Sequence, residues 1–75
     1  MTEKNFKITT IDDVKQFVNT VMMYAYDIDV VSGRYTVDAK SLMGLFSLDL
    51  STTLTLRIHS NDCDDLVDKL APFIV

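Results

Sequence analysis

The spacing of apolar residues along this chain switches repeatedly between the alternation of a strand and the spacing of a helix. This pattern constrains the fold more than any single motif does. Four short segments alternate apolar and polar residues, which is the pattern of half-buried strands. These segments are Lys4–Thr9, Tyr26–Val31, Arg34–Asp38 and Thr52–Ser60. Helical spacing of apolar residues in the intervening stretches predicts the order βαββαβα. Such a chain is expected to form an α+β open-faced sandwich, an antiparallel sheet with helices on one face.

The first and last helices are predicted from their caps and apolar stripes. Thr10 is expected to cap the first helix, with Asp13 at N3 replacing the Glu of a capping box. Its stripe comprises Ile11, Val14, Phe17, Val18, Val21 and Met22. The last helix is expected to begin near Ser60 or Asn61 and to end at Pro72. Its first turn would hold Asp62, Asp64 and Asp65, and its stripe Cys63, Leu66, Val67 and Leu70.

A hairpin and a short helix are predicted in the middle of the chain. Ser32-Gly33 is expected to form a two-residue turn, because Gly33 tolerates positive φ. In that register Val30 would pair with Tyr35, and Ile28 with Val37. The pairs lie on one apolar face. A short helix from Leu42 to about Leu48 would follow, capped by the Ser41 hydroxyl.

Composition limits the classes of protein that the chain can be. Its 75 residues, 48% of them apolar, predict one domain over residues 1–75 with a modest core. The net charge is −4 and no block of Lys or Arg occurs, so nucleic-acid binding is not expected. No apolar run is long enough for a signal sequence or a membrane span, which predicts a cytoplasmic location. The single cysteine, Cys63, cannot form an internal disulfide and is expected to be a buried small hydrophobe.

The segment Val37–Leu50, VDAKSLMGLFSLDL, resembles the region around the regulatory serine of the HPr family. That family comprises the phosphocarriers of the bacterial phosphoenolpyruvate:sugar phosphotransferase system. The shared pattern is a strand ending in Lys-Ser, an apolar residue, Met-Gly, two apolar residues and Ser-Leu. The resemblance implies the strand order 1-4-2-3 and a non-enzymatic protein without cofactors. It also implies protein partners such as HPr kinase/phosphorylase, Enzyme I or a transcriptional regulator, and a part in regulating sugar transport.

The family's carrier motif is not matched at the first helix. The family has Gly, apolar, His, Ala, Arg, Pro, Ala there, whereas this chain has TIDDVKQ at residues 10–16. Asp12 stands roughly in the place of the histidine that takes phosphate from Enzyme I, and a carboxylate repels a phosphoryl group. The chain's one histidine, His59, is expected on the outward face near the end of the fourth strand. Seven residues of strand would separate it from the carrier position by about 23 Å.

Ser41 is the strongest candidate for a functional residue. A capping role alone explains a serine there, while the resemblance implies regulatory phosphorylation, with Lys40 compensating the added charge. The resemblance also implies a partner-docking patch that comprises Lys40, Leu42, Met43, Phe46 and Ser47. The alternative is that several of these apolar side chains, together with Leu45 and Leu48, are simply core.

The acidic clusters do not predict a metal site or a catalytic pair. Asp12 and Asp13 point about 100° apart on a helix, so they do not converge on one ion. Asp62, Asp64 and Asp65 lack the glycine turn and terminal Glu of a calcium loop. The sequence therefore predicts a regulatory or docking module without a carrier histidine. Two alternatives stay open: phosphotransfer through an unusual residue such as Asp12, and a degenerate domain with an unrelated interaction.

Overall fold

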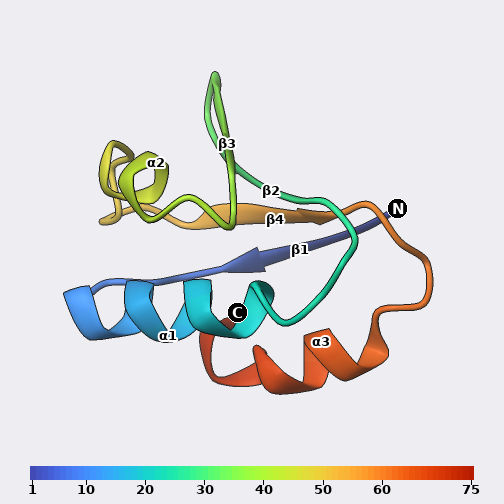
Figure 1. The fold of residues 1–75 in the computed structure, drawn as a ribbon. Helices are drawn as coiled ribbons and strands as arrows, with labels where there is room; N and C mark the ends of the chain where they lie inside the picture. The colour runs from blue at the N-terminus through green and yellow to red at the C-terminus, as the bar shows by residue number, and fades with distance from the viewer.

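A computed structural model describes all 75 residues as four strands and three α-helices (Figure 1). The element bounds are β1 (Thr2–Phe6), α1 (Ile11–Val21), β2 (Ile28–Ser32), β3 (Tyr35–Asp38), α2 (Leu42–Phe46), β4 (Leu54–Ile58) and α3 (Asp64–Lys69). A 3-10 helix, Ala71–Phe73, follows. All strand pairs are antiparallel, in the order β1-β4-β2-β3. The predicted α+β open-faced sandwich and its strand order are confirmed.

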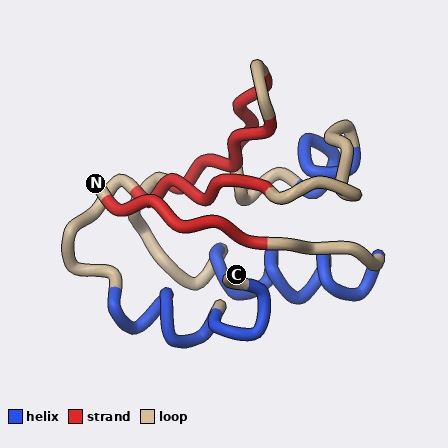
Figure 2. The backbone as a smooth tube through the Cα atoms, turned by 180° about the vertical axis from the view of Figure 1, so that it is seen from behind, coloured by secondary structure: helices blue, strands red, loops and turns tan.

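The core lies between the sheet and the layer formed by α1 and α3, which cover one face (Figures 1 and 2). Every buried side chain is apolar. The strands contribute alternate residues to it, among them Phe6, Val30 and Leu56. Phe17 of α1 stacks on Phe6 with ring centroids 4.9 Å apart. The helix α2 contacts α1 and β3, so it joins this layer only at one end of the sheet.

The hairpin forms, but its predicted register is wrong. Val30 pairs with Val37, and Ser32 with Tyr35, so the turn residues are Gly33 and Arg34. Gly33 has φ of 57°, which fits the first central position of a type II′ hairpin turn. The prediction put Gly33 at the second central position of the turn, whereas it occupies the first. The inward face is unchanged, because Val30 and Val37 keep the same parity.

Helix ends also differ from the predictions. Ile11 and Met22 are 63% and 61% exposed, because they lie at the ends of α1, and Figure 1 shows its first turn extending past β1. The predicted helix from Leu42 to Leu48 ends earlier, at Phe46. The last helix begins at Asp64 rather than near Ser60, since residues 59–63 carry the chain from the sheet to the helix layer. Asp62 therefore precedes that helix. Cys63 is buried, as predicted.

Both ends of the chain depart from the predicted pattern. The first strand starts at Thr2 and ends at Phe6, not at Lys4 and Thr9. Ile8 lies beyond its end yet is fully buried. The C-terminal tail returns to this strand, with a bridge between Phe6 and Ile74. No helix is both long and apolar enough to span a lipid bilayer.

Candidate functional site

The start of α1 is closed by its own side chains. Thr10 Oγ1 accepts a hydrogen bond from the Asp13 N–H at 3.0 Å. The Asp13 carboxylate in turn accepts from the main-chain N–H groups of Thr9 and Thr10, at 3.2 and 3.4 Å. The hydrogen bond from Thr9 lowers the pKa of the Asp13 carboxyl, and those from Thr10 add to the effect. The predicted capping box is therefore confirmed, and it places a second carboxylate beside the exposed Asp12.

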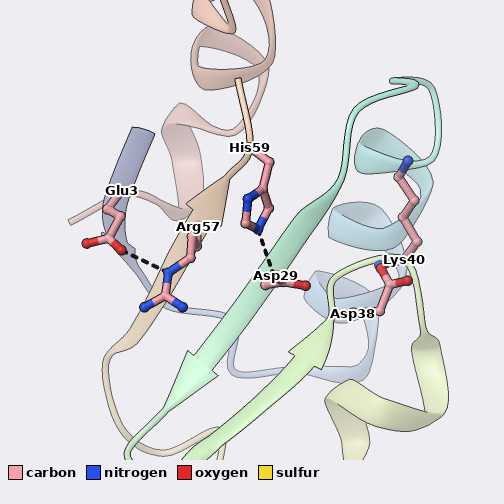
Figure 3. Close-up of polar contacts among 6 residues, drawn as sticks. All are labelled: Glu3, Asp29, Asp38, Lys40, Arg57 and His59. Atoms are coloured by element: carbon pink, nitrogen blue, oxygen red, sulfur yellow. Dashed lines mark hydrogen bonds and ion pairs between the residues drawn. The ribbon is translucent and has the colours of Figure 1, made fainter. Parts of the chain in front are cut away.

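His59 lies beside the start of β1, far from the start of α1, and on the face of the sheet that the helices do not cover. Ile58, the residue before it, pairs with Thr2 at the start of β1, whereas α1 follows the end of that strand. The Nε2 atom of His59 lies 2.8 Å from Asp29 Oδ2 on the open face (Figure 3). Arg57 and Glu3, whose Nε and Oε2 atoms are 2.9 Å apart, extend this row of charges. The predicted outward position of His59 is confirmed.

Ser41 caps α2 as predicted. Its Oγ atom accepts a hydrogen bond from the Gly44 N–H at 3.1 Å. A side chain at Gly44 would place a Cβ atom 3.1 Å from this oxygen and 3.4 Å from Val37 Cβ. Gly44 therefore allows the close approach between the cap and β3 that holds α2 in place. The Ser41 side chain stays partly accessible to solvent.

The helix α2 presents most of its apolar side chains to solvent. Met43 is 80% exposed, Phe46 40% and Leu42 36%, while Leu45 is fully buried. The prediction that some of these side chains stay exposed holds for three of them. Leu45 is core, and Leu48 packs against the core from a partly buried position. The Ser47 hydroxyl donates to the Gly44 carbonyl at 2.6 Å, at the end of the helix.

Lys40 has a contact that the sequence did not predict. Its Nζ atom donates to the main-chain carbonyls of Tyr24 and Tyr26, at 2.7 and 3.1 Å. Figure 3 shows the ammonium group turned away from the Asp38 carboxylate, which instead accepts from the Lys40 main-chain N–H. Lys40 thus holds the loop between α1 and β2, and its geometry does not support the predicted compensation of charge at Ser41. Lysine contacts with loop carbonyls leave no periodic signal in a sequence.

A cluster of polar side chains near α3 fixes the same loop. The Tyr24 hydroxyl donates to Asp65 Oδ2 at 2.5 Å, which raises the pKa of Tyr24 to about 12. Lys69 Nζ lies 5.6 Å from the centre of the Tyr24 ring. No group of three or more His, Cys, Asp or Glu side chains is arranged to bind a metal ion. The loop contacts are structural, which leaves α2 as the candidate functional element.

The fold and this site define a small α+β domain with a short, serine-capped and partly exposed helix, α2. The family model described as "PTS HPr component phosphorylation site" matches residues 13–75. The chain therefore belongs to the HPr family of phosphotransferase-system phosphocarriers, which are carriers rather than catalysts. Comparison with curated proteins gave no significant match.

Solved structures agree with this family. The chain is similar to HPr-C-His from Thermoanaerobacter tengcongensis, with 25% identity and a TM-score of 0.81 over 96% of this chain and 89% of that one. It also shares its fold with the phosphocarrier protein HPr from Bacillus anthracis str. Ames. That match has 22% identity and a TM-score of 0.74, and covers 99% of this chain and 96% of the other.

Proposed function

We propose that this member of the HPr family carries no phosphate on histidine and acts as a regulatory or docking module. The observation that carries the proposal is the position of His59, the chain's one histidine. It lies beside Asp29 on the open sheet face, remote from the start of α1. A histidine placed there cannot use the α1 start to hold a phosphoryl group.

The start of α1 also favours this proposal. Two carboxylates, Asp12 and Asp13, occupy its first turn, and Asp13 already accepts the N–H groups that precede the helix. Like charge opposes the approach of a phosphoryl donor. The alternative of carriage on Asp12 would need a cation to offset this repulsion, and no salt bridge is formed there.

Docking is proposed for the exposed face of α2. Leu42, Met43 and Phe46 form its apolar part, and Ser47 and Lys40 lie at its ends. Methionine suits an adaptable binding surface because its side chain is flexible and polarizable. The candidate partners are proteins of the family's pathway: HPr kinase/phosphorylase, Enzyme I or a transcriptional regulator. Ser41 is proposed as the phosphorylated residue, and a cytoplasmic location agrees with the family.

A phosphorylation experiment in two tubes tests the proposal. The protein is incubated with Enzyme I and phosphoenolpyruvate, and separately with HPr kinase and ATP, and each product is measured by intact mass. We expect no phosphoryl group in the first tube and one in the second, with loss of the second in Ser41→Ala. Ser47→Ala is the matched control and should still be modified.

Each other outcome points elsewhere. A phosphoryl group gained from Enzyme I would overturn the proposal, and its loss in Asp12→Asn rather than His59→Gln would assign the carrier to Asp12. If neither tube gives a product, Ser41 is not a switch. A degenerate domain with an unrelated interaction would then be the better interpretation.

A further inference from the structure

The two edges of the sheet are treated differently by the chain. The C-terminal tail covers the end of the outer edge of β1, with Lys7 N–H donating to the Phe73 carbonyl at 2.8 Å and Val75 N–H to the Asn5 carbonyl at 3.0 Å. The outer edge of β3 has no neighbouring strand. An unpaired edge is a template for pairing with another strand.

The main-chain groups that face this free edge can be identified from the hairpin register. Ser32 and Tyr35 flank the two-residue turn and form a hydrogen-bonded pair. Hydrogen-bonded and non-hydrogen-bonded pairs alternate in an antiparallel ladder, so the main-chain groups of Thr36 and Asp38 point outward. No loop or turn hydrogen bond uses those of Thr36. The centre of the β3 edge is therefore open.

We propose that β3 pairs with β3 of a second copy of this chain, antiparallel about a two-fold axis centred on Thr36. Main-chain N–H and C=O groups of the two Thr36 residues would then exchange hydrogen bonds. In this register Tyr35 of one copy lies opposite Val37 of the other, and Arg34 lies opposite Asp38. An isologous contact of this kind makes each pair twice.

Charge complementarity between Arg34 and Asp38 favours a second copy as the partner and favours this register. Arg34 forms no salt bridge within the chain, whereas Arg57 and Lys69 do. Asp38 lies opposite Asp29 across β2 and β3, and directly opposed like charges are destabilising. In the proposed register each Arg34 meets an Asp38 of the other copy. Moving the two-fold axis by one residue in either direction removes both charge pairs.

Side chains on the other face of β3 also match. Tyr35 is 69% exposed, so its ring is available for a contact with a second chain. An open hollow of about 1010 Å³ lies between the hairpin and the loop from α2 to β4, with Val37 and Leu48 as its remaining apolar lining. Pairing would bring Tyr35 of the second copy opposite Val37, beside this hollow. Aromatic and β-branched residues are a favourable cross-strand pair.

The contact involves four-residue strands, so its area falls below the roughly 1,200–2,000 Å² of stable interfaces. We therefore expect a weak dimer that fills as concentration rises from micromolar to millimolar. Sedimentation velocity on the full chain measures this. Arg34→Glu and Asp38→Lys should each weaken association by about tenfold or more, equal to about 1.4 kcal/mol.

Mixing the two variants is the sharp test of register. An Arg34→Glu copy paired with an Asp38→Lys copy regains opposite charges at both positions, so the equimolar mixture should dimerise about as tightly as the wild type, and about tenfold or more tightly than either variant alone. Circular dichroism melting checks that each variant is folded. This matters for Asp38→Lys, which removes the acceptor of the Lys40 N–H.

Thr36→Pro tests the main-chain bonds. Proline removes an N–H that faces outward on an edge strand, a position where it is tolerated. It should abolish the dimer, while the control Thr36→Ala should retain it. A wild-type protein that stays monomeric at millimolar concentration would overturn the proposal. So would a dimer that survives Arg34→Glu and Thr36→Pro, or a mixture without rescue.

Discussion

The starts of α1 and α2 are both capped by a hydroxyl, but the two caps leave different surfaces. At α1, Thr10 and Asp13 bond reciprocally, and the Asp13 carboxylate also takes the Thr9 N–H. At α2, Ser41 makes one side-chain bond, to Gly44 N–H, and no acidic residue lies in the first turn. The first start is chemically closed, whereas the second keeps an accessible hydroxyl beside exposed apolar side chains.

This difference between the two helix starts shows how a chain can have the family's fold while its first helix is unsuited to carrying phosphate. Carriage of phosphate needs an open helix start with positive charge, and the start of α1 offers carboxylates. A regulatory serine needs only a reachable hydroxyl on an element that partners can contact. The exposed face of α2 offers both, so the proposed function moves from the first helix to the second.

The largest expected effect distinguishes the buried and exposed sides of α2. Leu45→Ala should destabilise the protein by about 2–5 kcal/mol, because Leu45 is fully buried. Met43→Ala should change stability by less than about 0.5 kcal/mol, since Met43 is an exposed side chain. Urea unfolding measures both. A large loss for Met43→Ala would place that residue in the core and weaken the docking proposal.

A smaller effect is expected when each cap is removed. Thr10→Ala should cost about 1–2 kcal/mol because it breaks a reciprocal cap, and Ser41→Ala about 0.5–1 kcal/mol because it removes one bond. Urea unfolding at neutral pH compares them. Equal losses in the free energy of unfolding would contradict the interpretation that the α1 cap is reciprocal and the α2 cap is a single hydrogen bond.

The smallest effect appears only in acid. Because the folded-state pKa of Asp13 is lowered, its contribution is present above the unfolded-state value of about 4 and is lost as pH falls through the folded-state value. The stability gap between wild type and Asp13→Asn should therefore shrink on acidification. Unfolding curves at several pH values measure the gap. Asp12→Asn is the matched control, and an equal pH dependence for it would rule out the cap as the cause.

Residue parity explains why most of the fold could be predicted. Alternation in Leu54, Leu56 and Ile58 specified which face of β4 is buried, and all three are buried. A register error in the hairpin left its inward face intact, because the pairing shifted by an even number of residues. The turn itself was misplaced because both Ser32-Gly33 and Gly33-Arg34 contain a glycine that can adopt positive φ.

Long-range polar contacts could not be predicted in the same way. Nothing around Lys40 indicates that its ammonium reaches the carbonyls of Tyr24 and Tyr26. Likewise, the stripe of α1 could not show that Ile11 extends past the sheet. Such features depend on where layers end in space. The Ser41 cap was predicted because helix capping is a local rule that sequence records directly. Its candidacy as a functional residue came from the resemblance of Val37–Leu50 to the HPr family.

The C-terminal tail limits how much of the sheet edge is open to pairing with another strand. Residues 73–75 bond to the outer edge of β1 from Asn5 to Lys7, so they shorten the part of that edge at which another strand can add. A sheet with one free edge can form only a closed pair with a second copy. A sheet with two free edges can add copies on both sides and grow into a chain of sheets. If β3 pairs as proposed, the tail on β1 would favour a closed pair over growth into a chain of sheets.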